Sequence, residues 1–285
     1  NLKEIRTRIS SVKSTRQITS AMKLVSAAKL KKAQKRIENL RPYAEQLQHI
    51  LSFVGNSITE DDNIVYLKER PVKKILIVMI ASNKGLCGGF NANVTKKTIE
   101  EIENNYNNSE IEIFSIGSKG AEIFKKEKYN IVEKRTEIFD DLTYDNANEI
   151  SSLLMNWFAE GKYDKIITIY NQFINAATQR VQADQFLPLK LEQDEDEVTD
   201  YIFEPDKLSI TQDLIPKSLK TEFYKTLLDS NAAEHGARMT AMHKATDNAT
   251  ELRDDLKLSY NKARQASITN EILEIVAGAE ALADK

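Results

Sequence analysis

The sequence predicts an α/β fold: a long antiparallel coiled coil formed by the N- and C-terminal helices, with a Rossmann-like α/β domain inserted between them. The first observation is that the 285 residues include only 9 glycines and 5 prolines, about 5% together where about 12% is usual. The second is their placement, because residues 1–54 contain only Pro42 and residues 217–285 contain only Gly236 and Gly278. The third is that the middle of the chain alternates short apolar runs with helical patterns.

The N-terminal segment, residues 1–58, has the heptad pattern of a coiled-coil helix. Steps of three and four from Leu2 to Ile58 meet an apolar residue at thirteen of seventeen positions, which indicates a continuous seam. The four exceptions are consecutive, from Arg16 to Ser26, and there the apolar stripe moves back one position to Ile18, Met22 and Val25. We therefore expect the seam to face another direction in this stretch. Pro42 should kink the helix or destabilise it by roughly 3 kcal/mol.

The C-terminal segment, residues 214–285, is expected to form the second helix of the pair, beginning after Pro216. Alanines at a spacing of four form a stripe that lets another helix approach closely; they are Ala233, Ala237, Ala241, Ala245 and Ala249. Further on, a spacing near 3.5 returns at Ile268, Ile272, Ile275, Ala279 and Leu282. Such a helix spans roughly 100 Å, whereas a compact chain of this length has a radius of gyration of about 19 Å. We therefore expect it to protrude.

The middle segment, residues 72–204, is predicted to be the inserted domain. Its strands are expected at 72–81, 111–116 and 165–170, and its helices at 93–106, 118–126 and 145–159. Short strand–helix units of this kind predict a small parallel sheet covered by helices. Residues 192–206 carry eight acids and no base, and we interpret them as a solvated loop or an edge hairpin.

Composition excludes several classes of protein. A net charge of -3 with 41% hydrophobic residues is too apolar for a disordered chain. The longest apolar run is Ile75–Ala81, so we expect no direct membrane span. The single cysteine, Cys87, excludes an internal disulfide framework.

A glycine-rich stretch, Gly85–Gly89, follows the first predicted strand and has to be tested as a phosphate loop. The P-loop motif GxxxxGK[ST] and the dinucleotide motif GxGxxG are both absent. We interpret this stretch as a structural turn and expect no cofactor there. The turn residues are Gly85, Leu86, Cys87 and Gly88.

No catalytic or metal-binding set emerges from the remaining residues. A nucleophilic Cys87 would need a neighbouring base, but the histidines all lie on the predicted coiled coil, where we expect them to be exposed; they are His49, His235 and His243. His235 and His243 are two helical turns apart, which is not the spacing of a HExxH-like metal pair. The sequence therefore predicts no catalytic residues, no cofactor and no metal site.

The first helix is strongly basic. Residues 1–36 hold one acid, Glu4, and eleven bases: Lys3, Arg6, Arg8, Lys13, Arg16, Lys23, Lys29, Lys31, Lys32, Lys35 and Arg36. Unless this is only a solvated face, it implies an acidic protein, nucleic acid or an anionic membrane as partner. The segment has no aromatic residue for base stacking, which disfavours nucleic acid, and the coiled-coil seam already uses the apolar face that a membrane would need. An acidic protein partner is the favoured interpretation.

At several places the sequence resembles a known family, the γ subunit of F-type ATP synthase in its bacterial form. Residues 260–282 are similar to the family's C-terminal signature, whose matching positions are Ile268, Thr269, Glu271, Glu274, Gly278 and Ala279. Residues 18–25 resemble its first-helix motif, and residues 238–242 and 245–249 resemble its last helix. The Gly85–Gly88 turn matches the family's central turn. Four positions depart from the family: Ser20 and Leu24 stand where lysine and methionine are common, and Asn83-Lys84 replaces Asp-Arg.

The resemblance implies the central rotary shaft, or central stalk, of the ATP synthase. The coiled coil would lie inside the ring of α and β subunits, which carry out catalysis, and the α/β domain would contact the ε subunit and the c-ring. The basic helix would face an acidic loop of the β subunits. The residues implied to contact the ring are Met22, Lys23, Arg238, Arg264, Gln265, Thr269 and Glu271. The complex would lie at the cytoplasmic face of the bacterial inner membrane.

A different hypothesis explains the same charge pattern without a motor. A coiled-coil tether or nucleic-acid-binding arm on an α/β enzyme would also combine a basic helix with an inserted domain. It predicts intrinsic turnover or a salt-dependent RNA affinity in the purified chain, and the shaft predicts neither.

Overall fold

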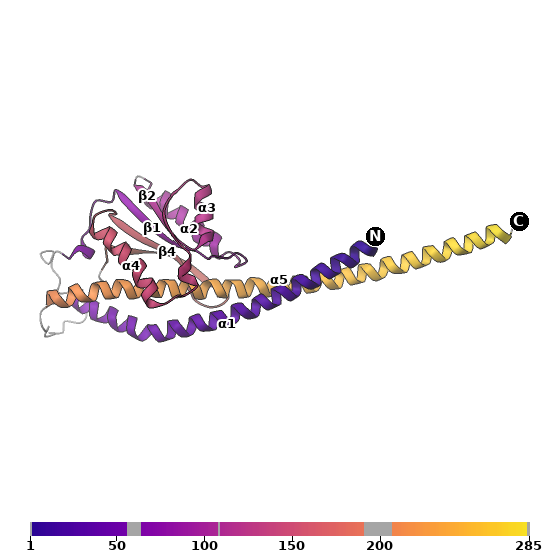
Figure 1. Cartoon of the computed structure of the whole chain (residues 1–285), viewed down its shortest axis with the longest axis horizontal. Helices are drawn as coiled ribbons and strands as arrows, with labels where there is room; N and C mark the ends of the chain where they lie inside the picture. The colour runs from indigo at the N-terminus through magenta and orange to yellow at the C-terminus, as the bar shows by residue number, and fades with distance from the viewer. Residues whose placement is uncertain (1, 56–63, 108, 191–206, 284–285) are drawn as a thin grey trace. The chain divides into compact units, whose positions relative to one another are not determined.

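A computed structural model describes residues 2–55, 64–107, 109–190 and 207–283 of the protein (Figure 1). In chain order, one long helix, α1 (Leu2–Gly55), precedes an α/β domain, and another, α5 (Lys207–Ala283), follows it. This confirms the predicted fold class. By their contacts the residues form two units, one of residues 26–238 and one of residues 1–25 with 239–285. This division differs from the predicted boundaries because parts of both helices pack into the α/β core. The acidic stretch 192–206 lies outside the described residues.

A five-stranded sheet with the order β3-β2-β1-β4-β5 forms the centre of the larger unit. The strands are β1 (Lys74–Ile80), β2 (Glu110–Ile116), β3 (Asn130–Arg135), β4 (Lys165–Phe173) and β5 (Gln179–Leu187). The first four are parallel, whereas β5 pairs antiparallel with β4, so the sheet is not the purely parallel one that was predicted. Neither β3 nor β5 was predicted, because both are edge strands and their polar sequences carry little apolar signal.

The alternating side chains of β1 build two separate cores. Ile75, Ile77 and Met79 face α2 (Phe90–Asn105) and α3 (Ser118–Lys126). The intervening Leu76, Val78 and Ile80 face α4 (Tyr144–Ala159) and α5. Two short 3₁₀ helices, η2 (Val65–Leu67) and η3 (Glu137–Phe139), complete the unit. Every side chain from Ile75 to Ile80 is fully buried, as expected for the central strand of a sheet covered on both faces.

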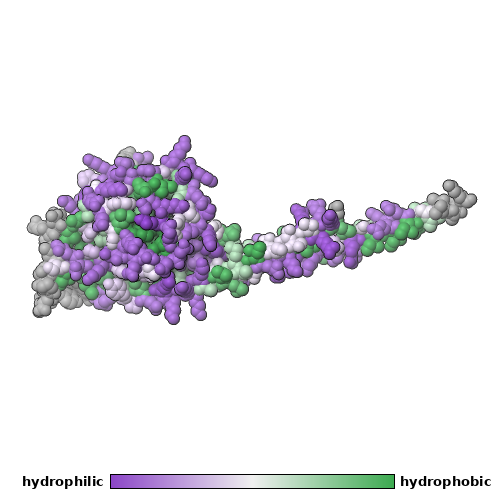
Figure 2. Space-filling view, in the orientation of Figure 1, coloured by the Kyte–Doolittle hydropathy of each residue, from purple (hydrophilic) through white to green (hydrophobic). Residues whose placement is uncertain are grey.

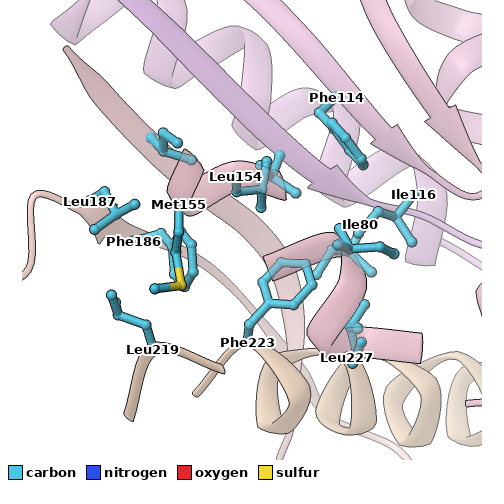
Figure 3. Close-up of a cluster of buried hydrophobic side chains, with 14 of the residues drawn as sticks. Ile80, Phe114, Ile116, Leu154, Met155, Phe186, Leu187, Leu219, Phe223 and Leu227 are labelled. Carbon is cyan, nitrogen blue, oxygen red and sulfur yellow. The ribbon is translucent and has the colours of Figure 1, made fainter. Parts of the chain in front are cut away.

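The first turns of α5 are part of this core. Leu219, Phe223 and Leu227 pack with Leu154 and Met155 of α4 beneath the sheet (Figure 3), and all three are at most 2% exposed. The helix begins at Lys207, so the prediction that it begins after Pro216 is wrong. Pro216 removes one backbone donor, but its neighbours Ile215 and Leu219 are both buried in the core, and this packing holds the helix continuous through the proline.

The seam of α1 keeps one direction along the helix. Ile18 and Val25 are 60% and 56% exposed, whereas the polar residues Thr19 and Ser26 are 9% and 3% exposed. The prediction that the seam turns toward Ile18, Met22 and Val25 is therefore wrong. The polar seam is tolerated because the hydroxyl of Thr19 is hydrogen-bonded both across the helix pair and within α1: the Thr246 hydroxyl of α5 donates to it (2.8 Å), and it donates to the carbonyl of Arg16 (3.1 Å). Pro42 is exposed, and α1 continues through it.

Within the smaller unit, α5 continues beyond the N-terminal end of α1 (Figure 1). Every residue from Ile268 to Ala279 is exposed, including Ile272 at 54% and Ile275 at 71%. Figure 2 shows apolar surface along this part of α5. The apolar side chains between Ile268 and Ala279 are therefore not covered by another helix of the described chain. Among the described helices, none is both long and apolar enough to cross a bilayer.

Gly117 permits a close approach of two backbone segments at the end of β2. It follows β2 with a φ of +93°, a conformation that L-residues rarely adopt. A Cβ added there would lie 2.1 Å from the carbonyl oxygen of Ala81, and the Gly117 amide donates to the carbonyl of Arg135 (2.8 Å). Any side chain at this position must displace the ends of neighbouring strands.

We predict that Gly117→Ala lowers the free energy of unfolding by more than about 2 kcal/mol, because it adds both a backbone strain and a steric clash. Urea denaturation followed by circular dichroism measures the change. The matched control is Gly85→Ala, where a Cβ would meet nothing within 4 Å and the expected change is below about 0.5 kcal/mol. Equal effects of the two substitutions would contradict the prediction.

Candidate functional site

The turn between β1 and α2 is organised by a small set of polar side chains. The Ser82 hydroxyl donates to the carbonyl of Lys84 (2.8 Å), and the amide nitrogen of Asn91 donates to the Ser82 hydroxyl (2.8 Å). Asn91 Oδ1 accepts from the backbone N–H of Ser82 (3.0 Å), which ties the start of α2 to the end of β1. These bonds leave Leu86 at a φ of +62° and Gly88 at +59°, so the chain reverses tightly between them.

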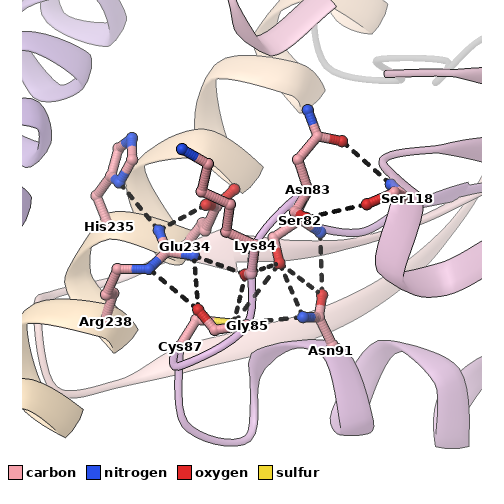
Figure 4. Close-up of polar contacts among 10 residues, drawn as sticks. All are labelled: Ser82, Asn83, Lys84, Gly85, Cys87, Asn91, Ser118, Glu234, His235 and Arg238. Carbon is pink, nitrogen blue, oxygen red and sulfur yellow. Dashed lines mark hydrogen bonds and ion pairs between the residues drawn. The ribbon is translucent and has the colours of Figure 1, made fainter. Parts of the chain in front are cut away.

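The carbonyl groups of this turn bind the side chain of Arg238 on α5 (Figure 4). Its guanidinium donates to the carbonyl of Lys84 (2.8 Å) and to that of Gly85 (3.3 and 3.4 Å). A third nitrogen donates to Glu234 Oε1 at 2.6 Å, one helical turn earlier. Arg238 is only 8% exposed, so its charge is compensated almost entirely by these groups.

Burial governs the electrostatics of this cluster. It raises the pKa of the Glu234 carboxyl, and the guanidinium of Arg238 acts in the opposite direction. Burial also lowers the pKa of His235 to about 4, with Arg238 and Lys29 adding to the shift. The imidazole is therefore neutral at pH 7, which allows its Nδ1, 3.4 Å from the Arg238 guanidinium, to accept a hydrogen bond.

His235 corrects one sequence prediction. We expected all three histidines to be exposed, and His49 and His243 are, but His235 is 9% exposed. The reason is that α5 is buried on every side in this stretch, residues 232–238. On the face opposite His235, Ala233 and Ala237 share an apolar cluster with Cys87 and Phe90. The alanine stripe therefore lets the sheet domain, rather than another helix, approach α5 at these two positions.

The turn has the wrong polarity for a phosphate site. A phosphate loop directs backbone N–H groups at an anion, whereas Lys84 and Gly85 direct carbonyl oxygens at a cation. Cys87 is 2% exposed and donates weakly to the carbonyl of Lys84 (3.8 Å), so its thiol stabilises the turn. Within the ranges that the structure describes, no cluster of His, Cys, Asp or Glu side chains could hold a metal ion.

The second candidate site is the exposed end of α5. Four of the residues implied to contact partners are exposed there: Arg264, Gln265, Thr269 and Glu271. The signature residues Ile268, Glu274, Gly278 and Ala279 are exposed as well. A contiguous exposed apolar stripe of this kind is typical of interaction surfaces.

Two further residues that the resemblance implies to contact the ring lie on α1 in the same unit. Met22 and Lys23 are half-buried in the helix pair, while the bases Arg6, Arg8 and Lys13 are exposed. The basic face is thus available to a partner. Arg238 differs from the other six residues implied to contact the ring, because it is buried among groups of its own chain.

Sequence reasoning missed two residues of α5 that help to hold it against the sheet domain. Glu234 precedes Arg238 by four positions, a spacing at which opposite charges pair on one helix face, and this signal could have identified the pair. Gly236 gave no signal of its role: a Cβ there would lie 3.3 Å from the Cα of Ala176, so only glycine leaves ordinary contact distance to the β4–β5 turn.

A sheet domain with a long helix that ends in an exposed apolar stripe defines a class of α/β proteins built to contact other subunits through a helical extension. A family model described as ATP synthase matches residues 1–282. The chain belongs to the gamma-chain family of ATP synthases, of the bacterial F type, as the sequence motifs had indicated.

Individual relatives agree with this assignment. The chain is 58% identical to the ATP synthase gamma chain of Christiangramia forsetii and 56% identical to that of Flavobacterium psychrophilum, and each alignment covers 99% of both chains. Its fold is similar to a chain from the central stalk and c-ring of the mitochondrial ATP synthase of Tetrahymena thermophila, with a TM-score of 0.62 and 25% identity over 80% of this chain and 99% of that one. A chain of the Euglena gracilis mitochondrial enzyme shares the fold at a TM-score of 0.70 and 20% identity, over 99% of this chain and 94% of that one.

We predict that the buried neutral His235 makes the protein lose stability in acid. Its folded pKa of about 4 lies below the ordinary value of 6.5, so the unfolded state binds the proton first as the pH falls. The stabilisation is complete above pH 6.5 and is lost progressively down to pH 4, by about 3 kcal/mol in total. Urea denaturation of the wild type and His235→Gln at pH 7.5, 5.5 and 4.5 measures it. We expect a shallower pH dependence in the variant, and identical slopes would contradict the assignment.

Proposed function

We propose that the chain is the rotor shaft of a bacterial ATP synthase, coupling ion flow through the c-ring to the catalytic cycle of the α and β subunits. The observation that carries this proposal is the exposed end of α5, where the family signature and an unpaired apolar stripe coincide. Membership of the gamma-chain family supports it. An apolar helix end suits a smooth bearing inside a ring of subunits, since it makes few directional bonds that would resist rotation.

Catalysis belongs to the α and β subunits in this proposal. The chain contributes differential contacts: as the shaft turns, each catalytic site meets a different face of it, and the populations of its conformations shift accordingly. Six side chains would make ring contacts: Met22, Lys23, Arg264, Gln265, Thr269 and Glu271. The exposed bases of α1 would face an acidic surface of the β subunits.

The α/β domain would contact the ε subunit and the c-ring, and the whole would sit peripherally at the cytoplasmic face of the inner membrane. Related chains come from structures that include a c-ring and a rotor, which supports this arrangement. The apolar stripe of α5 and the sheet domain would then serve different partners.

Reconstitution tests the proposed function. Purified α and β subunits are assayed for ATP hydrolysis with and without the full chain, and the complete complex is assayed for ATP-driven proton pumping in inverted vesicles. We expect the chain to be required for pumping and to have no ATPase activity alone. Intrinsic turnover, or salt-dependent retention of RNA by the free chain, would instead favour a tether or nucleic-acid arm.

We predict that the double variant Arg264→Glu, Gln265→Glu uncouples the motor without unfolding the chain. Both side chains are exposed, so stability should change by less than about 0.5 kcal/mol. Acids facing an acidic ring should lower the protons pumped per ATP hydrolysed by roughly an order of magnitude, because charge-assisted contacts become repulsive.

The control is Lys96→Glu on α2, a charge reversal at a side chain that is 79% exposed and makes only a surface ion pair with Glu100 (3.7 Å). It should pump like the wild type. Unchanged pumping in the double variant would contradict the placement of Arg264 and Gln265 against the ring.

A further inference from the structure

The edge of the sheet between β1 and β4 is the place where an open α/β domain usually binds a ligand. The strand order reverses there, because β1 is followed in space by β2 and β3 on one side and by β4 on the other. Crevices at such a switch point, outside the carboxyl ends of the strands, hold ligands in many α/β proteins. In this protein α5 occupies the position.

Two contacts seat α5 there. Gly236 packs on the turn between β4 and β5, with Ala176 and Phe173 within 3.5 Å of where its Cβ would be. Arg238 reaches the turn after β1, where it binds the carbonyls of Lys84 and Gly85. The helix thus contacts the loops that follow both strands of the switch point, in the place of a ligand.

Arginine suits this position better than lysine. The guanidinium has three nitrogens in a fixed fork. Here Nη2 donates to the carbonyls of Lys84 and Gly85, Nε also donates to that of Gly85, and Nη1 donates to Glu234. A lysine ammonium is a point charge on a flexible stem and cannot meet two backbone carbonyls and a carboxylate in the same fixed geometry. Glu234 in turn holds the guanidinium in its orientation and balances its buried charge.

We propose that Arg238 is a positioning residue that clamps α5 to the turn after β1, so that torque on the helix is transmitted to the sheet domain. The proposal rests on the shaft function given above. Arg238 is the last residue of the unit that contains the sheet, and Met239 belongs to the other unit. The clamp therefore stands at the end of the part of α5 that is held by the sheet domain. Without it the helix retains apolar contacts there, which resist sliding less than oriented charged hydrogen bonds do.

The test uses Arg238→Lys, Arg238→Gln and Glu234→Gln in the full chain, each assembled into the complete complex. We expect ATP hydrolysis to remain while protons pumped per ATP fall by at least about threefold, with Arg238→Lys intermediate between the wild type and Arg238→Gln. Hydrogen exchange of the backbone amides of residues 82–91 should rise by about tenfold, since the turn loses its cross-link to α5.

The matched control is Arg253→Lys on the same helix. Arg253 also makes a two-bond ion pair, with Asp254 at 2.9 Å for both bonds, but it belongs to the other unit and holds no backbone carbonyl of the turn. It should pump and exchange like the wild type. A merely structural role for Arg238 would raise amide exchange without lowering the ratio of protons to ATP.

Unchanged pumping per ATP in Arg238→Gln would overturn the clamp. If a variant does not assemble into the complex, amide exchange is measured on the free chain instead. Exchange of residues 82–91 at the wild-type rate would then overturn the clamp as well. Failure of the proposed function is distinguishable, because the wild-type chain itself would then not restore pumping to the reconstituted complex. A lowered ratio in the variants beside full pumping by the wild type and Arg253→Lys supports the clamp.

Discussion

The burial of one face of α5 in the α/β core is the interaction on which the rest of the structure depends. Phe223 and Leu227 fill the space beneath the sheet and are at most 1% exposed, so the start of the helix cannot move independently of the domain. The same backbone then continues without interruption to Ala283, and its side chains from Ile268 to Ala279 are exposed. A helix with one part fixed in a core and the other free to meet partners is a mechanical connector, because its hydrogen-bond ladder passes force from one part to the other.

Continuity of the helices matters more than apolar perfection of their seam. Thr19 and Ser26 interrupt the apolar stripe of α1, yet both are buried in the seam, which continues at Leu30 and Ala33. The hydroxyl of Thr19 accepts a hydrogen bond from Thr246 there. Pro42 and Pro216 each remove one hydrogen bond without ending a helix. The near absence of glycine and proline elsewhere in α1 and α5 fits chains that must resist bending.

Much of this architecture could be predicted from periodicity. The presence of the two long helices and the elements from β1 to β4, except β3, were predicted, because buried strands and amphipathic helices leave strong apolar patterns. The start of α5 and the seam of α1 were not. β5 escaped prediction, since a polar edge strand takes its conformation from hydrogen bonds to β4. The buried state of His235 and the clamp at Arg238 escaped it too, because both depend on which distant parts of the chain pack around α5, a long-range contact that no local pattern encodes. The turn at Gly85–Gly88 was interpreted as structural because the phosphate-loop and dinucleotide motifs are absent. The structure adds that its carbonyl groups bind the guanidinium of Arg238.

The central claim, that this chain turns inside a ring of subunits, is tested most directly by watching rotation. Cys87, the only cysteine, is buried, so a cysteine introduced at the exposed Lys125 of α3 can carry a bead while the ring of α and β subunits is fixed to a surface. On addition of ATP the bead should rotate in one direction, and it should stop when ATP is removed. ATP hydrolysis at the normal rate with a stationary bead would contradict the claim.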